Sequence, residues 1–222
     1  MKSWNMLPSG EIFAASFSGG KDSALAIYKA EQAGHVLGLV SMFNEDGRSG
    51  AHGLSESFIR KQAEAMGLPI RFGHASWEGY GEVFTGLLRE YKALGAEALL
   101  TGDLDVPEEN CWHERVSGNA ELDFYAPLWQ MDHVEEAREF VRQGFSAVVV
   151  CVNTKMGMTK ADLGRFFDGA YVEELLTRGV DPSAEAGEFH TAVVDGPSFH
   201  VPVSYQTGEI RALKEYFQLE LL

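Results

Sequence analysis

The sequence is poor in cysteine and has no long apolar run. Cys111 and Cys151 are the two cysteines among 222 residues, and no CxxC pair is present. Two isolated thiols exclude a disulfide framework and a metal or redox motif built on paired cysteines, and they favour a reducing compartment. Nowhere do eighteen apolar residues follow one another, and Met1 to Pro8 lack an apolar stretch of signal-peptide length. We therefore expect a soluble, cytoplasmic protein with no membrane partner.

Basic side chains are also scarce. The chain has 18 lysines and arginines against 33 aspartates and glutamates, which gives a formal net charge of -15 at pH 7. A nucleic acid or an acidic membrane would be repelled unless a local basic cluster met it. The sequence has no such cluster, so nucleic acid is disfavoured as a partner.

Short apolar runs alternate with amphipathic segments of helical length along the first half of the chain. This alternation is typical of a parallel sheet with crossover helices. Apolar side chains make up 45% of the residues, enough for a substantial core. The pattern predicts an α/β fold, with strands at residues 12–17, 36–43, 70–74 and 98–101 and helices at residues 21–33, 55–66 and 83–94.

The pattern weakens after Gly102. Residues 103–117 are acidic and predict a loop that can include one helical turn, and together with residues 124–129 they predict an active-site rim. We expect a first domain of residues 1–130 and a smaller α+β region of residues 131–222. The elements expected in this second region are a helix at 134–143, a buried strand at 147–152, helical segments up to 178 and short extended pieces up to 205.

The segment from Ser18 to Ser23, SGGKDS, lies between the first predicted strand and the first predicted helix. A strand, a glycine-rich turn and a helix place backbone N–H groups and the positive end of a helix dipole around an anion. Two glycines permit close approach, Lys21 adds a charge, and the two serines add hydroxyl donors. The alternative is a plain strand-to-helix turn in which Asp22 and Ser23 favour the helix start. The six residues together favour a phosphate loop.

Two common nucleotide motifs do not fit this segment. The Walker loop requires glycine at the position of Ala15 and serine or threonine at the position of Asp22. The dinucleotide fingerprint requires glycine where Ser18 stands. Ordinary P-loop hydrolysis and hydride transfer are therefore both disfavoured.

The segment SGGKDS after a first strand resembles the pyrophosphatase loop of PP-loop ATPases in the adenine nucleotide alpha-hydrolase-like superfamily. The resemblance implies a Rossmann-like fold that binds ATP and Mg²⁺ and cleaves ATP between the α and β phosphates. It also implies that Asp22 is a metal ligand. The nucleotide-binding residues implied in the same way are Ser16, Ser18, Gly19, Gly20, Lys21, Asp22, Ser23, Asn44, Gly102 and Asp103.

Further stretches resemble one branch of that superfamily over almost the whole chain. Residues 185–191, EAGEFHT, followed by 195–197, DGP, look like the signature of diphthine–ammonia ligases and their prokaryotic relatives. Similarity to the central block of these ligases is carried by residues 101–104, Glu114, Val116 and residues 127–129. His52, Gln62, Ala63 and residues 163–165 also match.

This resemblance implies a ligase of diphthamide biosynthesis that adenylates a carboxylate, releases pyrophosphate and transfers ammonia to give an amide and AMP. The expected partners are ATP, ammonium and a diphthine-bearing elongation factor or another carboxylate substrate. Ser183-Ala184 replaces the usual Cys-Gly pair, and residues 106–110 replace a Tyr-Gln segment, so the acceptor stays open. The alternatives are a PP-loop ATPase that amidates or thiolates a nucleic acid or small molecule, and a nucleotide sensor without turnover.

The resemblance assigns catalysis to Lys21, Asp22, Glu114, Glu185 and Glu188. Glu185 and Glu188 can converge on Mg²⁺ or ammonium, or be two solvated carboxylates. His190 is either a proton carrier or a turn residue. A zinc HExxH motif starting at His113 fails because Ser117 stands where the second histidine is required. Four aromatic residues can form a substrate wall, although packing is expected for most of them: Trp77, Tyr80, Trp112 and Trp129.

Overall fold

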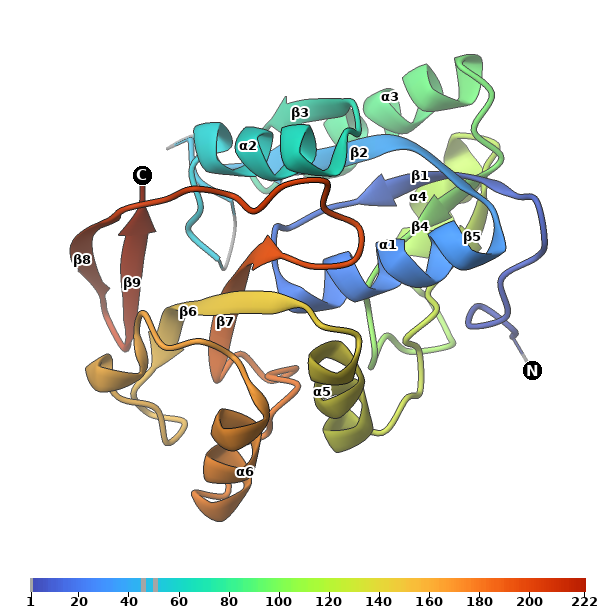
Figure 1. Cartoon of the computed structure of the whole chain (residues 1–222). Helices are drawn as coiled ribbons and strands as arrows, with labels where there is room; N and C mark the ends of the chain where they lie inside the picture. The colour runs from blue at the N-terminus through green and yellow to red at the C-terminus, as the bar shows by residue number, and fades with distance from the viewer. Residues whose placement is uncertain (1, 45–46, 50–51) are drawn as a thin grey trace.

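The computed structural model describes residues 2–44, 47–49 and 52–222, and it contains two sheets (Figure 1). The first is a five-stranded parallel sheet with the order β3-β2-β1-β4-β5. Its strands are β1 (Ile12–Ser16), β2 (His35–Phe43), β3 (Ile70–His74), β4 (Ala98–Leu100) and β5 (Asp123–Tyr125). The predicted α/β fold with a parallel sheet is confirmed.

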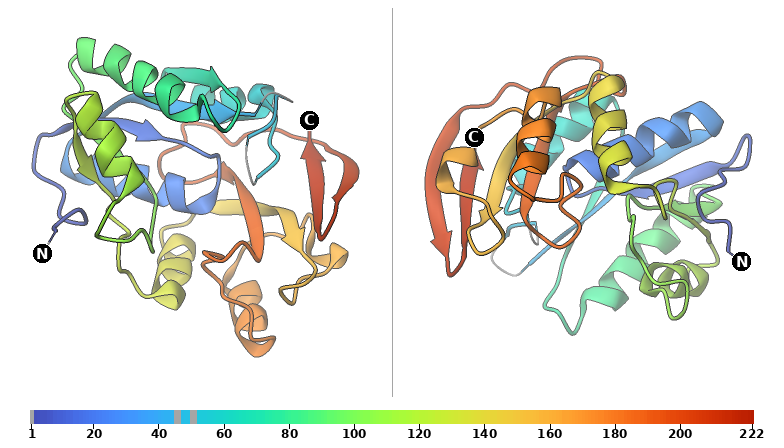
Figure 2. Two further views of the ribbon diagram at one scale, coloured as in Figure 1. Left: turned by 180° about the vertical axis from the view of Figure 1, so that it is seen from behind. Right: turned by 90° about the horizontal axis from the view of Figure 1, so that it is seen from below.

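Helices cover both faces of this sheet. Because successive side chains of a strand point to opposite faces, Phe13 and Ala15 of β1 enter one apolar core and Ala14 enters the other. The first core includes α1 (Lys21–Ala33) and α2 (Glu56–Met66), and the second includes α3 (Tyr80–Ala93) and α4 (Trp112–Asn119). Figure 2 shows α3 and α4 side by side.

The second sheet is antiparallel and has the order β7-β6-β9-β8. Its strands are β6 (Ser146–Asn153), β7 (Phe189–Asp195), β8 (Thr207–Leu213) and β9 (Tyr216–Leu221). The first apolar core continues into this sheet, so β6 and β7 are packed against the α1 side of the parallel sheet. Two neighbouring helices, α5 (His133–Arg142) and α6 (Gly169–Thr177), complete this part of the molecule together with the short 3-10 helix η1 (Lys160–Asp162) (Figure 2).

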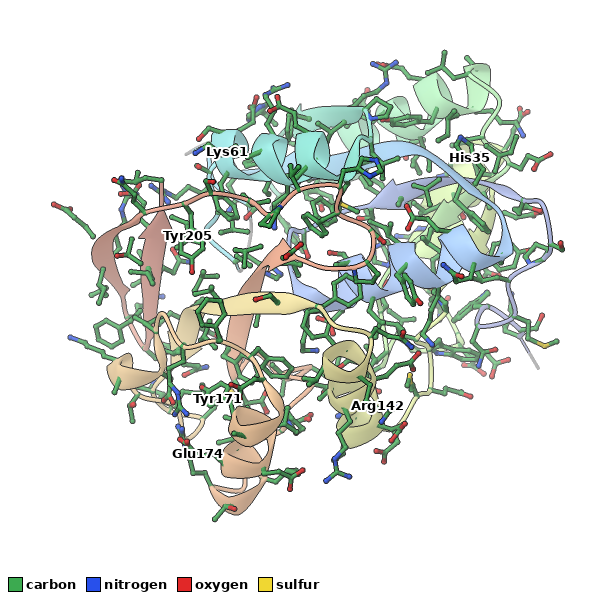
Figure 3. The ribbon with its side chains drawn as sticks, viewed as in Figure 1. His35, Lys61, Arg142, Tyr171, Glu174 and Tyr205 are labelled. Atoms are coloured by element: carbon green, nitrogen blue, oxygen red, sulfur yellow. The ribbon has the colours of Figure 1, made fainter. Side chains whose placement is uncertain are left out.

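A polar cluster links η1 to α6. The buried carboxylate of Asp162 accepts hydrogen bonds from Tyr171 Oη at 3.1 Å and from the Arg178 guanidinium at 2.7 and 2.9 Å. Arg165 and Glu174 extend the cluster through a two-bond ion pair. Tyr171 and Glu174 are labelled on α6 in Figure 3. The cluster fixes the connection between β6 and β7.

Four elements differ from the sequence predictions. The segment expected to be a loop that can include one helical turn contains α4, an eight-residue helix whose buried residues are Val116 and Ser117. So short a buried stripe gives little apolar periodicity. The expected rim contains β5, a three-residue strand, and the hairpin β8–β9 was not predicted at all. Most side chains of β8 are exposed, so the alternation that identifies a strand is missing there.

The described residues contain no helix that combines the length and the apolar character needed to cross a membrane.

Candidate active site

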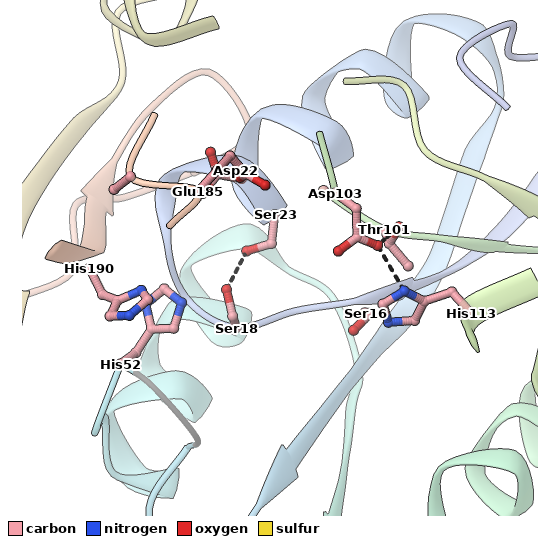
Figure 4. Close-up of a pocket in the computed structure, with 12 residues that line it drawn as sticks. Ser16, Ser18, Asp22, Ser23, His52, Thr101, Asp103, His113, Glu185 and His190 are labelled. Atoms are coloured by element: carbon pink, nitrogen blue, oxygen red, sulfur yellow. Dashed lines mark hydrogen bonds and ion pairs between the residues drawn. The ribbon is translucent and has the colours of Figure 1, made fainter. Parts of the chain in front are cut away.

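A polar cavity of about 230 Å³ lies at the carboxyl ends of β1 and β4 (Figure 4). The strand order reverses at this point, because β2 follows β1 on one side and β4 lies on the other. Crevices at such switch points are the usual ligand sites of open α/β sheets. The lining residues come from four separate stretches of the chain: Ser16, Ser18, Asp22, Ser23, His52, Thr101, Gly102, Asp103, His113, Ala184, Glu185 and His190.

The segment SGGKDS forms the floor of the cavity and the start of α1. Gly19 has φ +84°, and a Cβ there would lie 2.6 Å from Gln62 Oε1, so both the backbone and the space require glycine. Gly20 is the N-cap of α1, so the N-cap residue itself supplies no side-chain cap. The Ser18 and Ser23 hydroxyls lie 3.2 Å apart beside this end. The segment therefore presents a helix N-terminus to the cavity.

Strand β7 of the second sheet holds this loop in place. The Lys21 backbone N–H donates to Thr191 Oγ1 at 3.1 Å, and the Val193 N–H donates to the Gly19 carbonyl at 2.9 Å. The buried Gln62 side chain donates to the carbonyls of Gly19 and Val193, at 2.9 and 2.7 Å. The loop of the first sheet thus depends on the second sheet for its position.

The Lys21 ammonium points away from the cavity into the protein. It contacts Asp22 and lies 2.8 Å from Glu136 Oε2 on α5, and its side chain is 2% exposed. Burial alone would lower the pKa of Lys21, but the charges of Asp22 and Glu136 outweigh burial and raise it. Burial raises the pKa of the Glu136 carboxyl, and the charge of Lys21 opposes this rise.

Residues that follow β4 form a second wall. Gly102 approaches the start of α1 so closely that a Cβ would lie 2.6 Å from the Asp22 carbonyl carbon. Asp103 Oδ2 accepts from Thr101 Oγ1 at 2.7 Å and lies 2.9 Å from Nδ1 of His113 on α4. Burial would raise the pKa of Asp103, but the bonds and charge of His113 lower it below its usual value. This wall therefore presents an ionised carboxylate.

The third wall comes from His52 and from the turn before β7. The His52 and His190 rings lie 4.6 Å apart, and His52 Nδ1–H donates to the Thr191 carbonyl at 3.0 Å. Burial lowers the pKa of both imidazoles, so they are uncharged at neutral pH. Partial burial raises the pKa of the Glu185 carboxyl to about 7, and the nearby charge of Asp22 adds to this rise.

Seven of the residues predicted to act here line the cavity: Ser16, Ser18, Asp22, Ser23, Gly102, Asp103 and Glu185. Glu114 lies elsewhere, because it points to Lys2 and forms an ion pair with it. Glu188 is buried behind the turn, and its Oε2 has no hydrogen-bond partner within the described part of the chain. Asn44 follows β2 at an exposed position outside the lining. The roles assigned to these three residues stay predictions without a place in the cavity.

His113 and Glu136 are among the residues of the site that were not assigned a role from the sequence. His113 was considered only as a zinc ligand, although it directly precedes Glu114 and takes the place in the cavity that was expected for Glu114. The buried position of Glu136 can be recognised from the sequence pattern, because Glu136 is one residue before Ala137 and four before Phe140, on the buried face of α5. A carboxylate on an apolar face indicates a buried partner.

Comparisons with known proteins identify the family of the chain. The model of the diphthamide synthase N-terminal domain matches residues 12–123, and that of the diphthamide synthase C-terminal domain matches residues 132–218. No curated protein matches the chain. Among solved structures, it is similar to one described as a predicted subunit of tRNA methyltransferase from Methanocaldococcus jannaschii, with 16% identity, a TM-score of 0.46, and coverage of 84% of this chain and 97% of that chain. Since the two family models together span nearly all of the sequence, the chain belongs to the diphthamide synthase family.

Proposed function

We propose that the protein is an ATP-dependent ligase that converts a carboxylate and ammonia into an amide, with release of AMP and pyrophosphate. Family membership supports the ligase class. The observation that carries the proposal is the cavity itself, which joins a helix N-terminus, the residues after β4 and the turn that contains Glu185.

The residues around the N-terminus of α1 fit the phosphates of ATP. The N-terminus of the helix has no cap from its N-cap residue, and the hydroxyl-bearing residues Ser16, Ser18 and Ser23 line the same cavity. Bound there, ATP supplies the leaving group that activates a carboxylate. The loop would orient the phosphates, and β7 and Gln62 hold the loop in place.

The charge of the cavity supports a nucleotide that arrives with Mg²⁺. Among the described residues, the lining contains the carboxylates of Asp22, Asp103 and Glu185 and no lysine or arginine. A polyphosphate alone would be repelled by three carboxylates, whereas a cation between them would be attracted. Within the described residues, no group of three His, Cys, Asp or Glu forms a ready metal site, so oxygens of the nucleotide are needed to complete the coordination. Asp22 is the proposed protein ligand.

The same charge suits ammonium, and Glu185 is the proposed base. With a pKa of about 7, Glu185 is partly ionised at neutral pH and can take one proton from ammonium. The resulting ammonia attacks the activated carboxyl carbon, the C–N bond forms, and the bond from that carbon to AMP breaks. The neutral His190, which lines the same cavity, can accept a second proton as the amide forms.

Product analysis tests this proposal. The protein is incubated with MgATP, ¹⁵N-labelled ammonium and a diphthine-bearing elongation factor, and the expected products are AMP, pyrophosphate and a ¹⁵N-labelled acceptor. ADP as the product would contradict α–β cleavage. AMP formed only with a nucleic acid or small molecule would point to a different acceptor, and ATP binding with no turnover would point to a sensor.

Two lysine variants of α1 control the assay. Lys21→Ala is expected to lose most AMP formation, because the contacts of Lys21 with Asp22 and Glu136 hold the loop in position. Lys29→Ala removes a lysine of the same helix that pairs with Glu139 away from the cavity, and it should leave AMP formation unchanged. Equal activity of the two variants would refute the assignment of the loop.

A further inference from the structure

One imidazole joins two segments that carry walls of the polar cavity. The first segment is the β4 loop, residues 101–111, and the second is the Glu185 turn, residues 181–188. His133, the first residue of α5, lies between them, with Nε2 3.1 Å from Asp105 Oδ2 of the β4 loop and Nδ1 2.6 Å from Asp181 Oδ2 of the Glu185 turn. These three side chains form the His133 bridge.

The His133 bridge lies next to two residues of the cavity. Asp103 is two residues before Asp105, Glu185 is four residues after Asp181, and both line the cavity (Figure 4). Burial raises the pKa of Glu185 to about 7, and Asp22 and Asp105 are among the charges that add to the rise. A change in the bridge would therefore alter how the Asp103 wall lies relative to the Glu185 wall.

The bridge requires a protonated imidazole. An ionised carboxylate only accepts hydrogen bonds, whereas a neutral imidazole carries one N–H donor and an imidazolium carries two. Burial would lower the pKa of His133, but the bonds and charges of Asp181 and Asp105 outweigh burial and raise it. The bridge is therefore complete below about pH 6.5, and it is lost as the pH rises through the raised pKa of His133.

The two bonds of the bridge differ in strength. The Asp181 side chain is 25% exposed, and its second oxygen accepts from the N–H and the hydroxyl of Ser183, both at 2.9 Å. The Asp105 side chain is 59% exposed, and its contact with His133 is longer. When His133 loses its proton, the one remaining N–H stays with Asp181 and the Asp105 carboxylate turns to water. The β4 loop is then released, and the Glu185 turn is not.

Other charged groups near the start of α5 have partners of their own. Asp132 caps α5 and accepts a backbone N–H of that helix at 3.0 Å, and Glu136 turns toward α1. From α6, which packs on α5, Glu173 pairs with Arg138 at 2.7 Å. The positive end of the α5 dipole disfavours an imidazolium at His133. Its protonation therefore depends on the two carboxylates of the bridge.

We propose that His133 is a positioning residue of the site, whose protonated imidazole holds the β4 loop against the Glu185 turn. When His133 is protonated, the two walls keep the arrangement that the structure shows. When it loses the proton, the β4 loop and its Asp103 carboxylate are released while Glu185 stays in place. The release of the loop follows from the bridge alone, and its effect on catalysis rests on the proposed ligase function.

Amide hydrogen exchange measured by mass spectrometry tests the bridge without a ligand. Each variant is compared with the unmodified protein at the same pH, with rates corrected for local sequence. At pH 5.5, His133→Ala should speed exchange of the β4 loop and of the Glu185 turn about twofold to fivefold. At pH 9 the difference should vanish for the β4 loop and persist for the Glu185 turn, because the unmodified protein then keeps only the bond to Asp181.

Matched variants separate the bridge from general changes of surface. Asp105→Ala should speed exchange of the β4 loop at pH 5.5 and leave the Glu185 turn unchanged. Because Asp105 is more than half exposed, this variant keeps the fold even if His133→Ala does not. His74→Ala breaks a histidine pair with Glu56 Oε2 at 3.1 Å away from the cavity, and Glu109→Ala removes another exposed carboxylate of the β4 loop. Both controls should leave exchange of the two segments unchanged.

The kinetics of AMP formation give a second measurement. At pH 6, Asp105→Ala should raise the KM for ATP about threefold and leave kcat within about twofold, because only the Asp103 wall is released. His133→Ala should raise KM to the same extent and also lower kcat about threefold or more, because the Glu185 turn loses its bond too. At pH 9 the KM of the unmodified protein should approach that of Asp105→Ala, and His74→Ala should match the unmodified protein throughout.

Unchanged exchange of the β4 loop at pH 5.5 in both His133→Ala and Asp105→Ala would overturn the proposal. So would an acceleration of the loop in His133→Ala that is equal at pH 5.5 and pH 9, because the contact would then not depend on the proton. The expected exchange with an unchanged KM for ATP in both variants would refute the positioning role. If exchange behaves as expected but no AMP forms with any acceptor, the bridge stands and the ligase function fails. AMP formation with unchanged exchange gives the reverse result.

Discussion

Lys21 Nζ on α1 lies 2.8 Å from Glu136 Oε2 on α5, and the two side chains are 2% and 0% exposed. The pair joins α1, which follows the SGGKDS segment, to the part of the chain that carries the second sheet. Because water does not reach it, the removal of either partner leaves the other charge without solvation. The pair therefore couples the position of the loop to the packing between the two sheets.

The first prediction concerns this pair. Lys21→Met leaves the Glu136 carboxylate buried without its partner and should lower the free energy of unfolding by about 3 kcal/mol. Adding Glu136→Leu should restore most of that loss, because the buried charge is then gone. Urea unfolding measures the stability of both variants. The control is Lys29→Ala, which breaks a partly exposed ion pair and should lower the free energy of unfolding by less than about 1 kcal/mol. A double variant as unstable as Lys21→Met would show that the ion pair is not responsible.

The second prediction concerns the close approach of Gly102 to α1. In Gly102→Ala the new Cβ would meet the Asp22 carbonyl carbon at 2.6 Å and the Ser23 nitrogen at 2.7 Å, both of them backbone atoms. The start of α1 must then move, and we expect a loss of about 1–3 kcal/mol in stability and a fall of about tenfold or more in AMP formation.

The matched control is Gly118→Ala in α4. No atom lies within 4 Å of a Cβ at Gly118, and an alanine inside a helix should add up to about 1 kcal/mol of stability. Unfolding curves and AMP formation measured on both variants check the pair of predictions. An unaffected Gly102→Ala would mean that this contact does not position the helix.

The sequence predicted best what local signals determine. The helix from Lys21 to Ala33 was predicted at its observed bounds, because Gly20 and Gly34 flank an uninterrupted helical pattern. The strands β2 and β3 and the loop between β1 and α1 were found in the same way. Where apolar periodicity is short or absent, as in α4 and β8, the elements could not be identified.

The cavity was only partly predictable for a related reason. The loop residues carry a local motif, but the pairing of Lys21 with Glu136 joins positions 115 residues apart. The choice of Glu114 over His113 depended on the rotation of α4, since neighbouring residues of a helix point about 100° apart. Which of the two faces the cavity is decided by how α4 packs on α3 and β5, a tertiary contact that no single-residue pattern contains.

The third prediction concerns the buried carboxylate of Asp162. Burial would raise its pKa, but the bonds from Arg178 and Thr159 lower it below its usual value. A carboxyl group whose pKa is lowered in the folded state stabilises the fold at pH values above its ordinary pKa. This stabilisation is lost as the pH falls below about 4. Arg178→Ala should lower the free energy of unfolding at pH 7 by about 3 kcal/mol, because the buried Asp162 carboxylate then lacks its ion-pair partner.

Arg165→Ala is the control for Arg178→Ala. Arg165 lies 3.8 Å from Asp162, is more exposed, and bonds mainly to Glu174, so its removal should cost less than about 1 kcal/mol. In Asp162→Asn, the free energy of unfolding should also fall less steeply with decreasing pH at acid pH than it does in the unmodified protein. Equal losses in the two arginine variants would contradict the assigned roles.

The fourth prediction concerns the pH dependence set by Glu185. Its pKa is raised from 4.5 to about 7, chiefly by burial, so its ionised form is disfavoured in the folded state. The stability advantage of Glu185→Gln over the unmodified protein should therefore grow as the pH rises from about 4.5 to 7 and stay constant above that range. Unfolding measured at pH 4.5, 6, 7 and 8 checks the sign, and a difference that is constant over this range would refute the raised pKa.

The activity of the unmodified protein should increase over the same pH range in which its stability falls relative to Glu185→Gln. If Glu185 takes the proton from ammonium, AMP formation in the presence of acceptor should increase as the pH rises through about 7, because the ionised carboxylate is the base. Free ammonia also becomes more abundant at higher pH, so the unmodified protein alone cannot identify the group that titrates. Glu185→Gln experiences the same ammonia concentrations without the carboxylate. The increase near pH 7 should disappear in this variant and only the slope due to ammonia should remain, whereas an unchanged profile would exclude Glu185 as the base.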